Sequence, residues 1–331
     1  MPVALTIIGL GKIGASVGLA LAGHRSRLIR TGHDRQPEAA QKARARGAVD
    51  RIAYNLPAAV AEADVVLLAL PADQIRPTLE VLAADLREDG LILDVSPIKK
   101  QAAAWVRELL PPRRHYLGLM PAFSVDVMQQ PGEGLAAARP DLFRGGLMAI
   151  AAPPGTPGEA LALAADLTAL LGARPFFADL AELDGVAAAG HLLPQLTAAA
   201  LVEAGAAQPG WGDIRKLAGR PYASATEAAL APDSPAALAA AVLGNRADAL
   251  RLLDDLIAVL RSLRAVVAEQ DVAALAERLA AARAQRQQWW QARQTGVWDM
   301  EAGGLPELPR PSAVWKRELG ALLRPPRKRQ P

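Results

Sequence analysis

The chain has 331 residues, of which 51% are hydrophobic and 21% charged, and it contains no cysteine. This length allows two domains with separate cores, and the lack of cysteine excludes disulfides, thiol nucleophiles and thiolate metal sites. The net charge of +3 comes from residues 296–331, where seven basic residues stand against four acidic ones, so we expect a solvated tail there and no nucleic-acid-binding domain.

Apolar runs are short throughout the chain. None approaches the roughly eighteen residues that span a bilayer. The first residues also lack the basic leader and the cleavage site of a signal peptide. We therefore expect a cytoplasmic protein without a membrane segment.

Short apolar runs alternate with helical patterns over residues 1–178. Residues 65–70 (VVLLAL) form a continuous apolar run, as a strand buried on both faces of a parallel sheet does, and residues 91–95 repeat the type. The predicted strands cover residues 3–9, 28–32, 65–70, 91–95, 116–119, 147–150 and 174–177. Strands separated by helices pair in parallel, so the sequence predicts an α/β fold with a Rossmann-type, doubly wound, mostly parallel sheet.

The pattern changes at residue 179, after which only helical periodicity remains. One apolar stripe recurs at three- and four-residue spacing in Leu250, Leu253, Ile257, Leu260, Leu263 and Val267. We predict a dinucleotide-binding domain over residues 1–178, an all-α domain for substrate binding and dimerisation over 179–295, and a proline-rich basic tail over 296–331. Because such a stripe needs a partner surface, we expect a homodimer formed through the helical domain.

The segment IIGLGKIGASVGLAL has the pattern G-x-G-x-x-G between the first strand and the first helix. Gly9 permits the tight turn, Gly11 lets the backbone approach a diphosphate, and Gly14 lets the helix pack on the strand. The diphosphate then lies at the positive end of the helix dipole. Asp34, twenty residues after Gly14 at the end of the second strand, is placed to bind ribose hydroxyls.

These features predict a nicotinamide dinucleotide as the cofactor. The residues that we expect to bind it are Gly9, Gly11, Lys12, Ile13, Gly14, Asp34, Arg35, Leu70 and Pro71. The carboxylate of Asp34 repels a 2′-phosphate and so favours NAD, whereas a guanidinium at Arg35 leaves NADP possible.

Several segments resemble the prephenate and arogenate dehydrogenases of tyrosine biosynthesis. They are GLGKIGASVGLAL, ADVVLLALPADQI, GLAAARPDLFRGG, GNRADALRLLDDLIAVLRSLRAVV and, most specifically, LGARPFFADLAELDGVAAAGHLLPQLTAAAL. The resemblance runs from residue 4 to about residue 293. It implies a homodimer and hydride transfer to NAD with oxidative decarboxylation of a cyclohexadienol acid. It also implies a His that takes the hydroxyl proton, a nearby Ser, a second His, and an Arg that binds a substrate carboxylate.

Only part of this implied catalytic set is present. His191 matches the second His, although Gly190 stands where the family usually has Ser. Arg220 corresponds to the Arg for the substrate carboxylate after a one-residue shift, and its planar fork suits that task. The catalytic His is replaced by Met120 and the Ser by Pro97, and neither side chain can take up a proton at neutral pH.

Three residues are candidates for the missing catalytic roles. His191 is the remaining matched imidazole and is a candidate base. Ser96, one position before Pro97, is a candidate for a hydrogen bond to the nicotinamide or the substrate, and Lys99 for a bond to a carboxylate. We expect a small carboxylated molecule as the substrate, and no metal, because no His, Asp or Glu grouping has ligand spacing.

The departures at Met120 and Pro97 leave two alternatives open. The protein is a related dehydrogenase for another small hydroxy acid, or it is a catalytically weak homologue that binds NAD(H) as a sensor or subunit.

Overall fold

The computed structural model describes residues 2–128, 130, 132–230 and 234–295, so the predicted tail lies outside the described residues. Its strands are β1 (Val3–Ile8), β2 (Leu28–His33), β3 (Arg51–Ile52), β4 (Val65–Leu68), β5 (Leu91–Asp94), β6 (His115–Ala122), β7 (Leu147–Ala151) and β8 (Arg174–Ala178). They form one sheet in the order β3-β2-β1-β4-β5-β6-β7-β8. Only β6 and β7 pair antiparallel among the described strands, which confirms the predicted doubly wound, mostly parallel sheet.

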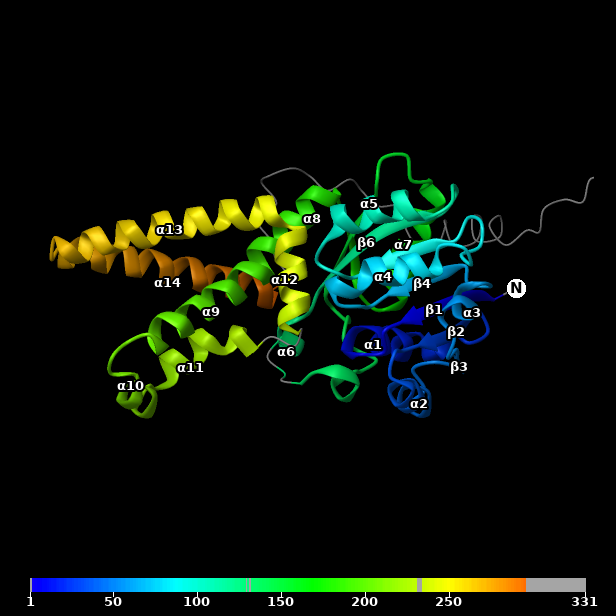
Figure 1. Ribbon diagram of the computed structural model, residues 1–331, viewed down its shortest axis with the longest axis horizontal. Coiled ribbons are helices and arrows are strands. Elements are labelled where there is room, and N and C mark those ends of the chain that lie inside the picture. Colours follow the sequence, from blue (N-terminus) through cyan, green and yellow to red (C-terminus); the bar gives the residue numbers. More distant parts are fainter. Residues whose placement is uncertain (1, 129, 131, 231–233, 296–331) are drawn as a thin grey trace, which may run out of the picture.

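Six helices cover the sheet, three on each face (Figure 1). Helices α1 (Lys12–Ala20), α2 (Pro37–Ala45) and α7 (Gly158–Leu170) pack on one face, and α3 (Leu56–Val60), α4 (Ala72–Leu82) and α5 (Lys99–Leu109) on the other. Strand β4 shows why both faces need cover, because Val65 and Leu67 join the first core while Val66 and Leu68 join the second. Strand β4 is therefore apolar along its whole length because each of its two faces packs against helices.

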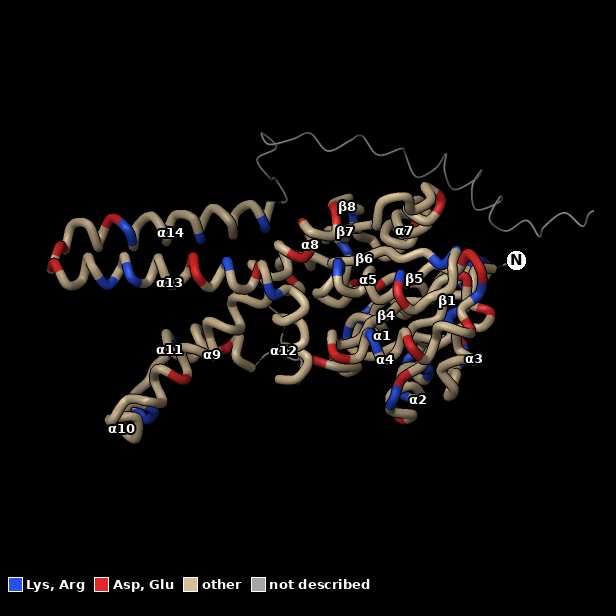
Figure 2. The backbone as a smooth tube through the Cα atoms, turned by 45° about the horizontal axis from the view of Figure 1, so that its top comes forward, with Lys and Arg blue, Asp and Glu red and all other residues tan. Residues whose placement is uncertain are grey.

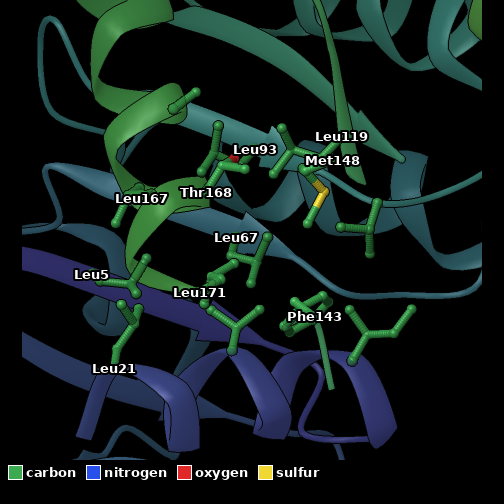
Figure 3. Close-up of a pocket in the computed structure, with 14 residues that line it drawn as sticks. Leu5, Leu21, Leu67, Leu93, Leu119, Phe143, Met148, Leu167, Thr168 and Leu171 are labelled. Carbon is green, nitrogen blue, oxygen red and sulfur yellow. The ribbon is translucent and has the colours of Figure 1, made fainter. Parts of the chain in front are cut away.

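The first of these cores is closely packed and almost entirely apolar. Figure 3 shows Leu5 of β1, Leu67 of β4 and Leu93 of β5 pointing toward Leu167 of α7 around a small internal space. Its lining is hydrocarbon except for Thr168 and the sulfur of Met148. Nothing there suits a charged ligand, so the functional site has to lie elsewhere.

After β8 the described chain is entirely helical. The elements are α8 (Leu180–Ala187), the π-helical turn η3 (Ala188–Leu192), α9 (Leu193–Ala206), α10 (Trp211–Leu217), α11 (Arg220–Thr226), the 3₁₀ turn η4 (Glu227–Leu230), α12 (Pro235–Gly244), α13 (Arg246–Ala268) and α14 (Val272–Thr295). Asp179 begins this part with a capping box, accepting the Glu182 N–H at 2.7 Å. Helices α13 and α14 form a long hairpin that points away from the sheet (Figure 1).

The structure differs from the sequence prediction in two elements of the sheet. Strand β6 extends through Ala122, and the edge strand β3 was not predicted, because two residues carry no readable alternation. Between β6 and β7 lie the short helix α6 (Val125–Met128) and the 3₁₀ turn η2 (Gly134–Ala137).

One continuous helix, Leu180–Ala206, comprises α8, η3 and α9. It has 27 residues, and an 18-residue window within it has a mean hydropathy of 1.4, which makes the helix long and apolar enough to cross a membrane by length and composition alone, a test that core helices also pass. Its first part packs on α5, and η3 packs on α13.

Candidate active site

An open groove crosses the carboxyl ends of the strands at the point where the strand order reverses, between β1 and β4. Parallel sheets of this type bind ligands at that position because the loops on either side diverge there. The residues that line it are Ile8, Gly9, Gly11, Lys12, Ile13, His33, Asp34, Arg35, Gln36, Leu56, Ala69, Leu70, Pro71, Gln74, Thr78, Val95, Ser96, Pro97, Phe123, Gly132, Glu133 and Gly134. The set includes Ser96 and every predicted cofactor residue except Gly14.

The glycine-rich turn between β1 and α1 forms the floor of the groove. Gly9 has a φ of +90°, and a Cβ there would lie 2.3 Å from the Ala69 carbonyl oxygen. A Cβ on Gly14 would lie 2.0 Å from the Gly9 carbonyl oxygen. Gly11 is different, because no atom lies within 4 Å of where its Cβ would be. Gly9 and Gly14 are therefore needed for packing, while Gly11 leaves open space of the kind that a diphosphate occupies.

Asp34 follows β2 and fixes the same turn. Its Oδ2 accepts the Leu10 N–H at 2.8 Å, and its Oδ1 accepts the Gln36 N–H at 2.9 Å. Each carboxylate oxygen has further lone pairs, so both can still accept hydrogen bonds from ribose hydroxyls. Arg35 beside it is exposed.

The opposite wall comes from the segment between β6 and β7. Lys12 Nζ donates to the Gly132 carbonyl at 3.2 Å, and the Arg139 N–H donates to Ser16 Oγ at 2.9 Å. Arg46 also donates to the Ala138 carbonyl at 2.7 Å. These bonds hold the segment against α1 and α2 beside the glycine-rich turn.

At the other end of the groove, the turn between β5 and α5 covers a buried polar cluster. Asp94 is completely buried, and its carboxylate accepts the Ser96 N–H and the Ser96 hydroxyl, both at 2.8 Å, and the Tyr116 hydroxyl at 2.9 Å. Lys99 is also completely buried, and its Nζ donates to the Asp94 carbonyl at 2.7 Å. A Cβ on Gly118 would lie 2.6 Å from Lys99 Cδ, so glycine there makes room for the lysine.

Burial sets the charge states in this cluster. It lowers the pKa of the Lys99 ammonium, and the carboxylates of Asp94 and Asp184 oppose that shift. It also raises the pKa of Tyr116 well above the usual value, an effect that the Asp94 carboxylate reinforces, so the phenol stays protonated and donates.

The helical domain holds this turn from the outside. Asp184 of α8 accepts the backbone N–H groups of Lys99 at 2.6 Å and Lys100 at 3.0 Å, which caps the start of α5. Asn245, between α12 and α13, donates from Nδ2 to the Pro97 carbonyl at 2.6 Å. A Cβ on Gly244 would lie 2.6 Å from Ile98 Cγ2.

Comparisons with known proteins identify the family. The profile of the prephenate dehydrogenase nucleotide-binding domain matches residues 17–176. The probable prephenate dehydrogenase NovF of Streptomyces niveus is 33% identical over 274 residues, which cover 78% of this chain and 68% of that protein. The chain belongs to the prephenate dehydrogenase family.

Other members of the family agree with this assignment. The cyclohexadienyl dehydrogenase of Zymomonas mobilis is 26% identical, with 81% of this chain and 89% of that protein covered. The structure of A. aeolicus prephenate dehydrogenase with hydroxyphenyl propionate and NAD+ has a TM-score of 0.77 at 20% identity, over 87% of this chain and 98% of that one. At that identity the match shows the fold alone. The predicted dehydrogenase class and NAD as cofactor are confirmed by the family.

His191, which matches the second His of the family, lies on the π-helical turn η3. Ala188 and Leu192 of this turn pack in a small apolar cluster with Ala72 and Ile98, which directly follow Pro71 and Pro97 of the groove. The turn thus flanks the end of the groove at which Ser96 lies. The imidazole is exposed to solvent, yet the surrounding protein lowers its pKa by partial desolvation, which favours the neutral base. π turns of this kind often occur at functional sites.

The remaining catalytic candidates are not all brought together. Lys99 does not line the groove; its Nζ donates to the carbonyl of Asp94, which itself lies behind Ser96. Arg220 is exposed at the start of α11, which packs mainly on α9 and η4 and lies away from the sheet (Figure 1). Met120 is half-buried on β6. Among the described residues, no group of three His, Asp or Glu side chains could hold a metal ion.

Sequence reasoning missed several residues around the groove. Gln74 and Thr78 lie on the first turns of α4, and Phe123 follows β6. The sequence signal that could have identified Gln74 and Phe123 is that each comes shortly after a strand, β4 and β6 respectively. Asn245 carried no such signal, because Pro97 is 148 residues away in the sequence.

Proposed function

We propose that this protein oxidises a cyclohexadienol carboxylate, prephenate or arogenate, with NAD+ and with loss of carbon dioxide, as a cytoplasmic enzyme of tyrosine biosynthesis. The observation that carries the proposal is the groove at the strand-order reversal of a prephenate dehydrogenase family fold, with the open space at Gly11 and the carboxylate of Asp34 at one end and Ser96 at the other.

The residues of the groove fit an extended dinucleotide. The backbone N–H groups at Gly11, Lys12 and Ile13 lie at the start of α1, where an anion is stabilised by the free donors and the helix dipole. The Asp34 carboxylate can accept hydrogen bonds from the hydroxyls of the adenosine ribose. NAD+, when bound, supplies the acceptor for a hydride, and its reactive end would lie toward Leu70, Pro71 and Ser96.

The chain offers one candidate for binding a substrate carboxylate and one candidate base. Arg220 corresponds to the carboxylate-binding Arg of the family after a one-residue shift, and His191, beside the groove, is the candidate base. For Arg220→Ala and His191→Ala we expect a large loss of kcat/KM, with NAD+ affinity unchanged because neither residue lines the groove. Steady-state kinetics together with calorimetry would check both expectations. Unchanged kcat/KM in a variant would remove that residue from the site.

Formation of NADH with purified protein, NAD+ and either prephenate or arogenate tests the activity directly. We expect turnover with at least one of the two acids, and a preference between them identifies the substrate. If cofactor binds but neither acid reduces it, the narrow assignment is wrong.

A second candidate is favoured by one specific observation. Met120 and Pro97 occupy the positions where the resemblance implies a catalytic His and Ser. Either other residues of this chain perform the proton transfer and hydrogen bonding of that His and Ser, or the substrate is a different molecule. A dehydrogenase for a different small hydroxy acid accounts for this change. Screening such acids and their keto partners with NAD+ and NADH separates the two candidates.

We also propose that the protein is a homodimer joined through its helical domain. Large apolar side chains are exposed there: Leu201, Leu243, Leu250, Ile257, Val259, Leu260, Val267, Val272, Leu279 and Trp289. Figure 2 shows α9 and α12 with very few charges, whereas charges of both signs are spread over the dinucleotide-binding domain. Exposed apolar surface of this extent is typical of a face that another subunit covers.

A further inference from the structure

A buried carboxylate lies one hydrogen bond behind the groove. Asp94 has no exposed surface, and its Oδ2 accepts the Ser96 hydroxyl proton at 2.8 Å. Ser96 is among the residues that line the groove, at the end where β5 meets the turn into α5. Ser96, which is 2% exposed, therefore stands between the groove and a carboxylate that does not line it.

We propose that Asp94, acting through Ser96, accepts the hydroxyl proton of the substrate during hydride transfer. The inference rests on the proposed dehydrogenase function. It gives this chain a proton acceptor although Met120 replaces the implied catalytic His, because a hydroxyl that donates to a carboxylate can itself accept a proton, whereas a thioether cannot.

The step balances without any further reactant. The substrate O–H proton moves to Ser96 Oγ while the Ser96 proton moves to Asp94 Oδ2, and the carbinol C–H bond breaks as its hydride passes to NAD+. A C=O bond forms on the ring. The C–C bond to the ring carboxylate then breaks, its electron pair enters the ring, and carbon dioxide leaves. The oxygen that has become phenolate takes the proton back from Asp94 through Ser96, which restores both residues.

Several donors and one positive charge surround the Asp94 carboxylate. Its Oδ1 accepts the Ser96 N–H, and its Oδ2 also accepts the Tyr116 hydroxyl of β6 at 2.9 Å. The Lys99 ammonium of α5 lies 3.8 Å from Oδ2. The nearby Asp184 of α8 is engaged by the two backbone N–H groups at the start of α5. The contacts of Asp94 hold its carboxylate in place behind Ser96.

Two variants of Ser96 test the relay. Ser96→Ala removes the hydroxyl, so we expect kcat with prephenate or arogenate to fall by about 10²- to 10⁴-fold. Ser96→Thr keeps a hydroxyl at the same place and is expected to retain kcat within about tenfold of wild type. Wild-type kcat in Ser96→Ala would overturn the relay.

Tyr116→Phe gives a second test, at a residue that does not line the groove. It removes one of the hydrogen bonds that Asp94 Oδ2 accepts, so kcat is expected to change while the Kd for NAD+ by calorimetry stays the same. A wild-type kcat in this variant would contradict Asp94 as the acceptor. If the wild type itself turns over neither acid, the proposed function fails and the relay with it. Wild-type turnover with an unaffected Ser96→Ala removes the relay alone.

Discussion

At the scale of single residues, Asp34 decides which dinucleotide the groove prefers. We predict that Asp34→Asn raises the KM for NAD+ about tenfold, because a charge-assisted hydrogen bond to the ribose becomes a neutral one. The KM for NADP+ should rise less, since the repulsion of a 2′-phosphate is removed. Kinetics with both cofactors measure the change in preference, and an unchanged ratio of kcat/KM would contradict it. Arg35→Ala is the matched control, because it leaves the carboxylate in place.

The same scale shows how far the sequence could predict the site. The sequence predicts Gly9, Gly11 and Asp34 because the dinucleotide pattern is local: it spans one strand, the turn after it and the end of the next strand. The sequence does not predict the hydrogen bonds around Asp94, because Tyr116 reaches Asp94 through the pairing of β5 with β6, in which Asp94 lies opposite Gly118. Asp184 lies 85 residues from the N–H group of Lys99 that it caps, and nothing in the sequence marks that contact.

At the scale of elements, β2 is tied to α1 and α2 by a buried arginine. Arg30 has no exposed surface and donates to the Asp50 carboxylate at 2.7 Å and to the carbonyls of Gly18 and Gly47. Burial raises the pKa of Asp50, but the hydrogen bonds from Arg30 outweigh this and keep it below its usual value of 3.8. The ion pair therefore stabilises the fold above about pH 4 and is lost as the pH falls through the lowered pKa.

We predict that Arg30→Met lowers the free energy of unfolding by about 3 kcal/mol at pH 7, because Asp50 and the carbonyls of Gly18 and Gly47 lose the guanidinium as a donor. The difference from wild type should narrow at pH 3, because that pH lies below the usual pKa of 3.8 at which Asp50 of the unfolded chain takes up a proton. Urea unfolding at both pH values measures it, and an equal difference at both would contradict the role of the ion pair. Apolar periodicity predicted the β2 strand, but it could not show that a charged residue is buried within it.

At the scale of the whole molecule, the proposed homodimer rests on the exposed apolar side chains of the helical domain. We predict that the wild type is a dimer at micromolar concentration and that Leu260→Glu, which places a charge on the exposed apolar face of α13, shifts it toward monomer. Val81→Glu on α4 is the control, because Val81 is 50% exposed and Leu260 54%, but Val81 lies in the other domain. Sedimentation velocity distinguishes the species, and a monomeric wild type would refute the dimer.

The central claim is that the groove binds a nicotinamide dinucleotide, and calorimetry with purified protein tests it most directly. The account predicts saturable binding of NAD+ to the wild type and none to Gly11→Val, a variant that should fold because no atom lies within 4 Å of the added Cβ. Circular dichroism of the variant checks that it does fold. A folded wild-type protein that binds neither NAD+ nor NADP+, or a Gly11→Val variant that binds NAD+ as tightly as wild type, would contradict the account.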